Sequence, residues 1–393
     1  MEIQFIDIYY PNVFRIYSAK YNIFRDLYEK DLTGLEIRGV DYKLAQNVKR
    51  IILSNKEICY HSGDHNKTLS DILVLGNYGI FRDLAKEIKA IGNEDLGFRI
   101  SNAIKNITDY DSGNIQIGNK IFSLNTASIA GILNITPDSF SDGGKYFSKK
   151  AAVEHGIKLL EDGADILDIG GESSRPDSLQ ISEEEELNRV IPVIEEILKL
   201  KPEALLSIDT TKSNVAIEAL KRGAKIVNDI SSFDFDNAMI DAVKKFDASI
   251  ILMHMKGNPL TMQISPEYED VVSEIYDYLL RKVETVRKSG IKNIIIDPGI
   301  GFGKSVADNY ELIKRLNELK GIGQPIMIGI SKKSLIGKSL NLEICEREIP
   351  SLVAETIAIK KGARFIRTHN VINAVYASKL NSYIENPEQL LNV

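Results

Sequence analysis

The stretch LLSIDTTKSNVAIEALKRGAKIVNDI, residues 205–230, contains one complete structural repeat. An apolar run at 205–209 ends in an acidic residue and a polar loop. A segment with helical periodicity follows at 214–222, and a second apolar run spans 225–230. The short apolar runs predict strands, and the periodic segment between them predicts a helix. This order is typical of a βαβ unit with parallel strands.

The same pattern recurs about every 30 residues from residue 114 onward. Apolar runs that predict strands lie at 128–136, 165–170, 205–209, 225–230, 249–255, 293–297, 325–331 and 364–369. Helical segments between them include 149–162, 183–200, 214–222 and 267–289. Eight βα units in about 265 residues match the size of a TIM barrel. The sequence therefore predicts an α/β protein with a (β/α)8 barrel.

The first third of the chain has a different organisation. Residues 1–113 contain helical and strand-like stretches without a shared period, and we interpret them as a smaller α/β domain of unknown role. Residues 114–393 then form the barrel domain. At its start, residues 115–124 alternate around Gly118 and Asn119, which predicts a β-hairpin that covers the N-terminal face of the barrel.

Composition excludes several classes of protein. The 393 residues carry a formal net charge of −6, with 49 Lys and Arg against 55 Asp and Glu, which argues against nucleic acid as a partner. The two cysteines exclude a disulfide scaffold and a four-cysteine zinc site. No apolar run reaches the roughly 20 residues of a membrane span, and the start does not resemble a secretory signal. We expect a cytoplasmic enzyme without a membrane partner.

Polar residues follow every predicted barrel strand. The strands end in Asn134, the 170–177 segment, Asp209, Asn228 with Asp229, His254, Asp297, Ser331 with Lys333, and Arg367 with His369. One such residue often only caps a helix. Eight polar ends at the carboxyl face of a barrel, where active sites of this fold lie, instead indicate catalysis.

The chemistry of this set indicates a ligand with two parts. Asn134, Ser174, Arg175, Arg367 and His369 are suited to a phosphate or pyrophosphate, and an Asn carbonyl suits a hydrated Mg²⁺. Three further groups, with a nearby lysine, suit a flat heterocycle with adjacent N–H groups. These are Asp209, Asn228 and Asp297, with Lys333 offsetting part of their negative charge.

Several motifs of this sequence resemble those of a known family. The resemblance rests on GILNITPDSFSDGG (131–144), DIGGESSRP (168–176), SIDTTK (207–212), NDI (228–230), LMHMKGNPLTMQ (252–263), DPGIGFGK (297–304), GISKKS (329–334) and IRTH (366–369). In identity, order and spacing these motifs resemble dihydropteroate synthases. The resemblance covers about residues 115–384, so residues 1–113 lie outside it.

The resemblance implies a role for each matching position. The pterin-binding residues would be Asp209, Asn228, Met255, Asp297 and Lys333. The pyrophosphate-binding residues would be Asn134, Ser174, Arg367 and His369, with Asn134 also holding Mg²⁺. The p-aminobenzoate-binding residues would be Phe140, Arg175, Pro176, Phe302 and Ser334. Catalysis would depend most directly on Asp142, Arg175, Lys333, Arg367 and His369.

The resemblance also implies an activity. Such an enzyme is a transferase of folate biosynthesis and a sulfonamide target, and it commonly forms a homodimer. It condenses 6-hydroxymethyl-7,8-dihydropterin pyrophosphate with p-aminobenzoate, giving 7,8-dihydropteroate and pyrophosphate with the help of Mg²⁺. Three positions depart from the commonest family pattern, namely Ser174, Ile300 and Lys332. Lys332 lacks the planar fork of the usual arginine.

Two other functions fit part of the pattern. A pterin-binding methyltransferase on the same barrel would use Asp209, Asn228 and Asp297, but it would need neither the long first loop nor the Ser-Lys-Lys-Ser stretch at 331–334. A non-catalytic pterin-binding protein would require the loss of a residue from the anion site or the loops, and the sequence has no such loss.

Overall fold

The computed structural model describes residues 1–21, 23, 33–53, 59–65, 69–136, 145–173, 180–259, 261–262, 264 and 266–390. The chain forms two compact units. The first contains Met1–Tyr110 and two later segments, Val272–Asp277 and Asn317–Gly323. The remaining segments form the second unit. The sequence does not predict that the two later segments belong to the first unit. The domain boundary that it predicts at residue 113 stays a prediction.

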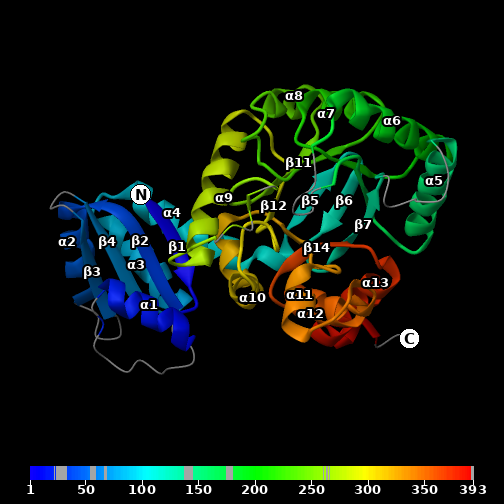
Figure 1. Cartoon of the computed structure of the whole chain (residues 1–393). Helices are drawn as coiled ribbons and strands as arrows, with labels where there is room; N and C mark the ends of the chain where they lie inside the picture. The colour runs from blue at the N-terminus through cyan, green and yellow to red at the C-terminus, as the bar shows by residue number, and fades with distance from the viewer. Residues whose placement is uncertain are drawn as a thin grey trace. The chain divides into compact units, whose positions relative to one another are not determined.

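The second unit is a TIM barrel, as the sequence predicts (Figure 1). Its described strands are β7 (Ser128–Asn134), β8 (Ile166–Gly170), β9 (Leu206–Asp209), β10 (Ile226–Asp229), β11 (Ser249–Met253), β12 (Ile294–Asp297), β13 (Ile326–Ile328) and β14 (Ala363–Thr368). Each strand pairs in parallel with its neighbours, and β14 pairs with β7 to close the barrel. All eight expected strands are therefore confirmed, and β13 is shorter than its apolar run.

Helices surround these strands (Figure 1). They are α5 (Lys145–Glu161), α6 (Glu183–Leu200), α7 (Ser213–Lys221), α8 (Met239–Lys245), α9 (Val271–Lys288), α10 (Val306–Lys314), α11 (Ser334–Leu340), α12 (Glu348–Lys360) and α13 (Val371–Glu385). The bounds of α6 coincide with those expected from the sequence. Ser182 caps this helix by accepting a hydrogen bond from Glu185 N at 3.2 Å, and four acidic residues in the first turn favour the positive end of the helix dipole.

The expected hairpin closes the floor of the barrel. Strands β5 (Asn114–Ile117) and β6 (Lys120–Ser123) are joined through Gly118, whose φ of +56° suits glycine at the first position of a two-residue hairpin turn. Ile117 and Phe122 pack in one buried cluster with residues of the barrel strands. The ring centroids of Phe122 and Phe365 in β14 lie 5.8 Å apart. The hairpin thus supplies apolar side chains to the barrel core.

The first unit contains a four-stranded antiparallel sheet in the order β1 (Glu2–Ile6), β2 (Thr33–Asp41), β4 (Leu69–Gly76) and β3 (Cys59–His65). Alternating residues of β4 face opposite sides of the sheet. Ile72 and Val74 pack toward the helices α2 (Tyr42–Leu53), α3 (Tyr78–Ala90) and α4 (Glu94–Thr108). Leu73 and Leu75 pack toward α1 (Pro11–Tyr21) on the opposite face. The sequence predicts an α/β arrangement here but not β1, α1 or β3.

A buried lysine joins the loops that follow β11 and β12. The Nζ atom of Lys304 donates to the carbonyl oxygens of Gly299 and Phe302 at 2.8 Å and of His254 at 3.2 Å. It also lies 3.0 Å from Nδ1 of His254. Burial, together with neighbouring positive charge, lowers the pKa of His254, and burial lowers the pKa of Lys304 as well. These contacts fix the loop that begins at Asp297.

Gly299 allows the two loops to approach each other. Its φ is +70°, and a Cβ atom there would lie 1.9 Å from the carbonyl oxygen of His254. Only glycine fits both the conformation and the distance.

None of the described helices is long and apolar enough to cross a membrane.

We expect the hairpin to contribute strongly to stability. Ile117→Ala removes a fully buried side chain from the barrel floor and should lower the free energy of unfolding by about 2–5 kcal/mol. The matched control is Ile121→Ala on the same hairpin, where the side chain is 71% exposed; its effect should stay within about 0.5 kcal/mol. Urea denaturation of both variants measures the difference, and equal effects would contradict the packing described here.

The Gly299 contact predicts a second difference. Gly299→Ala should destabilise the protein by about 1–3 kcal/mol more than Gly290→Ala, because only the first forces an atom against backbone. Gly290 also has a positive φ, +98°, but nothing lies within 4 Å of the place that a Cβ atom would take there. Thermal melting of the two variants separates the steric clash from the cost of conformation. A Gly299→Ala variant as stable as the Gly290→Ala variant would refute the close approach.

Candidate active site

Four residues form one row across adjacent strands at the carboxyl end of the barrel. In register, Asn134 of β7 pairs with Gly170 of β8, Gly170 with Asp209 of β9, and Asp209 with Asn228 of β10. A Cβ atom at Gly170 would lie 3.5 Å from Oδ1 of Asn134 and 3.7 Å from Oδ2 of Asp209. The amide of Asn134 and the carboxylate of Asp209 therefore border the same space.

Arg367 lies between two carboxylates. Its Nε donates to Oδ2 of Asp168 at 2.5 Å, and its Nη2 donates to Oδ2 of Asp209 at 2.7 Å. The Nδ2 of Asn228 also donates to Oδ2 of Asp168, at 2.9 Å. One hydrogen-bonded network thus joins residues from β8, β9, β10 and β14. The expected pyrophosphate-binding arginine is in direct contact with an expected pterin-binding carboxylate.

Burial and charge set the protonation of this network. Burial raises the pKa of Asp209 to about 7, although the Arg367 guanidinium acts in the opposite direction. Burial also disfavours the charge on Arg367, but Asp168 and Asp209 outweigh it and raise the pKa of the arginine. Arg367 is therefore a fixed cation that stands in direct contact with the buried Asp209 carboxyl.

Asp297 and Lys333 form the second charged part of the site. Oδ1 of Asp297 accepts a hydrogen bond from Gly299 N at 2.7 Å, and burial raises the pKa of this carboxyl against the influence of Lys333. Nζ of Lys333 donates to the carbonyl oxygen of Ile300 at 2.5 Å. Burial lowers the pKa of Lys333 to about 8, with Asp297 acting against this shift. Each group thus limits the cost of burying the other.

Gly329 lies beside both cations of the site. A Cβ atom at this position would lie 3.7 Å from Cβ of Arg367 and 3.8 Å from Nζ of Lys333. The two cationic side chains, from the ends of β13 and β14, thus border the same glycine.

Apolar groups line one side of this region. Phe302 packs in a small buried cluster with Met253 and Met262, and Met255 lies against it. The Nζ atom of Lys333 is 4.7 Å from the centroid of the Phe302 ring, a cation–π distance. These contacts bring together Met255, Phe302 and Lys333, the expected pterin-binding and p-aminobenzoate-binding residues that follow β11, β12 and β13.

The remaining described candidates are accessible to solvent. Ser334 is the exposed first residue of α11. His369 is exposed at the end of β14, where its backbone N donates to Oγ of Ser331 at 3.2 Å. Its Nδ1 lies 3.1 Å from the same hydroxyl. The expected residues Phe140, Asp142, Ser174, Arg175 and Pro176 lie outside the described residues.

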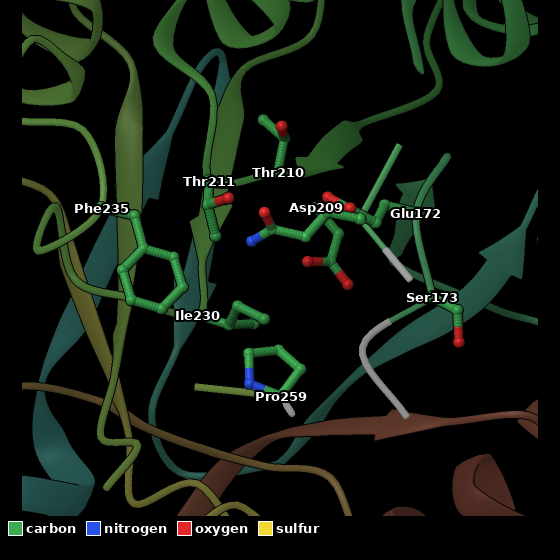
Figure 2. A pocket seen from close by; sticks show the side chains of 9 residues that line it. Glu172, Ser173, Asp209, Thr210, Thr211, Ile230, Phe235 and Pro259 are labelled. Carbon is green, nitrogen blue, oxygen red and sulfur yellow. The ribbon is translucent and has the colours of Figure 1, made fainter. Parts of the chain in front are cut away.

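A small pocket, partly open to solvent, lies beside Asp209. Figure 2 shows Glu172, Asp209 and Thr210 along one side and Ile230, Phe235 and Pro259 along the other. A wall of acceptors opposite an apolar wall suits a flat, polar-edged ring. Sequence reasoning did not select Ile230 or Phe235, because an apolar residue after a strand carries no chemical signal.

Asp168 is the main residue that sequence reasoning missed. It is buried in the middle of β8 and accepts hydrogen bonds from both Arg367 and Asn228. One signal was present in the sequence, because a carboxylate inside the apolar run ILDIG is costly unless it is paired. Among the described residues, no group of three or more His, Cys, Asp or Glu side chains could hold a metal ion.

Several known proteins are similar to this chain. The chain is 44% identical over 259 residues to a dihydropteroate synthase from Haemophilus influenzae, an alignment that covers 65% of this chain and 94% of that protein. A crystal structure of the Yersinia pestis dihydropteroate synthase with a sulfonamide drug superposes with a TM-score of 0.66 at 37% identity. The superposition covers 70% of this chain and 99% of the Yersinia pestis chain.

A second structure, of the Xanthomonas albilineans dihydropteroate synthase with 4-aminobenzoic acid, gives a TM-score of 0.66 at 38% identity, with the same coverage of 70% and 99%. The family described as pterin binding enzyme matches residues 130–369. This match contains all the strand-end residues described above. The chain belongs to the family of pterin binding enzymes.

Proposed function

We propose that this protein is a dihydropteroate synthase, a transferase that joins 6-hydroxymethyl-7,8-dihydropterin pyrophosphate to p-aminobenzoate. The observation that carries the proposal is the network of Arg367 with Asp168 and Asp209, because it sets hydrogen-bond acceptors for a heterocycle beside a cation for a leaving anion. Relatives and solved structures with the same activity support it.

The pterin-binding part of the proposal rests on buried acceptors. Asp209 and Asp297 would accept from the N–H groups on the edge of the pterin ring. The Nδ2 of Asn228 donates to Asp168, and the side-chain carbonyl oxygen of Asn228 would serve as an additional acceptor for the ring. Met255 would pack on the ring. Buried acceptors reject a ligand that lacks the matching donors, by as much as about 10⁴-fold.

The anion-binding part rests on Arg367 and His369, with Ser174 as a further donor. Arg367 is a fixed cation in the barrel mouth, and His369 follows it by two residues at the solvent edge. Both would stabilise negative charge that develops on the departing pyrophosphate. Donors that are already in place need no reorganisation when this charge appears.

Mg²⁺ fits the donor set of this site. Mg²⁺ bound to phosphates keeps several waters and takes only one or two protein ligands. The Oδ1 atom of Asn134, which borders the same space as Asp209, suits such a role. When bound, the ion would supply positive charge to the pyrophosphate oxygens. The residues described above fit this partial coordination, and they do not form an all-protein metal cage.

The proposed reaction breaks the C–O bond between the pterin methylene carbon and pyrophosphate. The bonding electrons leave with pyrophosphate, the amine nitrogen of p-aminobenzoate forms the new C–N bond, and the amine releases a proton. Phe302 and Ser334, with Phe140, Arg175 and Pro176, would hold the arylamine, and Lys333 would lie between the two substrates. Asp142, which follows the first barrel strand in the sequence, would be a further catalytic residue.

A pterin-binding methyltransferase remains the alternative. It would share the acceptors Asp209, Asn228 and Asp297 but would have no use for a pyrophosphate site. The contact between Arg367 and Asp209 favours the synthase, because it sets a cation where a leaving anion would need it. We also propose that the enzyme acts in the cytoplasm as a homodimer, and sedimentation of the purified protein tests the dimer.

The decisive experiment measures pyrophosphate release from the pterin pyrophosphate with and without p-aminobenzoate. We expect release that depends on p-aminobenzoate and matches the formation of dihydropteroate. Release that is independent of the arylamine would indicate hydrolysis, and no release would remove the proposal. A parallel assay of methyl transfer from a methylated pterin tests the alternative.

We expect Asp297→Asn to weaken binding of a pterin that lacks phosphates by at least about a hundredfold, because the amide presents a donor to the N–H edge of the ring. Isothermal titration calorimetry measures the affinity. Asp241→Asn makes the same chemical change on the exposed surface of α8 and should bind like the unmodified protein. Binding within threefold of the unmodified protein would argue against Asp297 as a pterin-binding residue.

A further inference from the structure

Helix α12 presents a polar stripe to the carboxyl ends of two barrel strands. Glu348, Ser351 and Glu355 are spaced three and four residues apart and therefore lie on one face of the helix. Ser351 and Glu355 are buried, at 4% and 2% exposure. Burying such groups is unfavourable unless they make specific hydrogen bonds. The stripe, defined as these three residues, makes its contacts at the ends of β13 and β14.

Two members of the stripe hold the residues on either side of His369. Nδ2 of Asn370 donates to Oε1 of Glu348, and Nδ2 of Asn373 donates to the same oxygen at 3.4 Å. The Glu355 and Thr368 side chains line the same small cavity, and Thr368 acts to lower the pKa of the Glu355 carboxyl. Thr368 and Asn370 flank His369 in the chain, so the helix fixes the backbone before and after the exposed imidazole.

The third member holds the residue before Lys333. Oγ of Ser351 accepts a hydrogen bond from the backbone N of Lys332 at 2.9 Å. Arg347, at the start of the helix, donates to the carbonyl oxygen of Lys332 at 3.3 Å. Lys332 has a φ of +57°, a strained conformation for a lysine that needs such external support. The direction in which the chain enters Lys333 thus depends on α12.

The two strand ends are also linked to each other. Ser331 accepts from the backbone N of His369 and lies next to its Nδ1. Between this serine and the stripe is a small cavity lined by Ser331, Ser351, Glu355 and Thr368, among other residues. Oε1 of Glu355 is buried without a hydrogen-bond partner.

Glu355 has the properties of a neutral carboxylic acid. Burial raises its pKa to about 8, and Thr368 only partly opposes this shift. A protonated glutamate both donates and accepts a hydrogen bond. Glutamine reproduces this pattern in nearly the same shape, which provides a conservative replacement for the test.

We propose that Glu348, Ser351 and Glu355 are positioning residues that hold His369 and Lys333 at a fixed separation, and thereby align the anion-binding group with the groups that bind the ring substrates. This inference rests on the proposed synthase function for its kinetic consequences. For anion affinity it needs only the proposed contact of His369 with pyrophosphate, which calorimetry measures without turnover.

The test compares Glu355→Ala, Glu355→Gln and Ser351→Ala with the control Thr356→Ala. Thr356 lies on the same helix and donates its hydroxyl to the carbonyl oxygen of Leu352 within that helix. Calorimetry with inorganic pyrophosphate in the presence of Mg²⁺ measures anion affinity. Pyrophosphate release at varied substrate concentrations gives kcat and KM, and thermal melting establishes that each variant is folded.

We expect Glu355→Ala to lower pyrophosphate affinity at least about fivefold, because Glu355 lies beside the strand end that carries His369. Both Glu355→Ala and Ser351→Ala should lower kcat about tenfold. Glu355→Gln should restore both values to within about threefold, and Thr356→Ala should leave them unchanged. If Glu355→Ala does not fold, Ser351→Ala alone carries the comparison.

Folded Glu355→Ala and Ser351→Ala variants with unchanged pyrophosphate affinity and kcat would overturn the inference. So would a Glu355→Gln variant impaired as strongly as Glu355→Ala, because shape and neutral hydrogen bonding would then not suffice. If the unmodified protein releases no pyrophosphate from its substrates, the proposed function fails. The calorimetric series still decides the positioning role in that case.

Discussion

The guanidinium of Arg367 and the carboxylates of Asp168 and Asp209 form an ion cluster at the carboxyl end of the barrel. Burying such charges is costly, and removing one partner from a buried pair typically costs about 3–5 kcal/mol because the other charge is left uncompensated. The partners are 199 and 158 residues apart in the chain. They meet because β14, β7, β8 and β9 are consecutive around the closed barrel. The charge network therefore depends on barrel closure.

Glycines lie within this crowded set of charges. Gly170 stands between Asn134 and Asp209, and Gly329 stands beside Arg367 and Lys333, each at ordinary van der Waals distance from them. Gly299 is different, because a Cβ atom there would lie 1.9 Å from the carbonyl oxygen of His254. The missing side chain of Gly299 therefore lets the loop after β12 touch the backbone that follows β11.

The outer helices of the barrel do more than cover apolar strands. Helix α12 contacts both strand ends, because Ser351 accepts a hydrogen bond from Lys332 N and Glu355 lies beside Thr368, the residue before His369. On the opposite end of the barrel, the β5–β6 hairpin fills the floor with Ile117 and Phe122. A floor that is packed with apolar side chains and a mouth that is crossed by charges divide stability and chemistry between the two ends, as is typical of this fold.

Local patterns in the sequence were sufficient to predict the repeat of strands and helices, the capped helix α6, and the glycine turn at Gly118. They also predicted that Asp209 and Asp297 end strands, because strand periodicity and polar strand ends are properties of a few consecutive residues. The contact of Arg367 with Asp209, the role of Asp168 and the support of Lys332 by Ser351 were decided by the tertiary structure alone. These contacts join residues far apart in the chain, and their partners follow from barrel closure and helix packing, which no local period encodes.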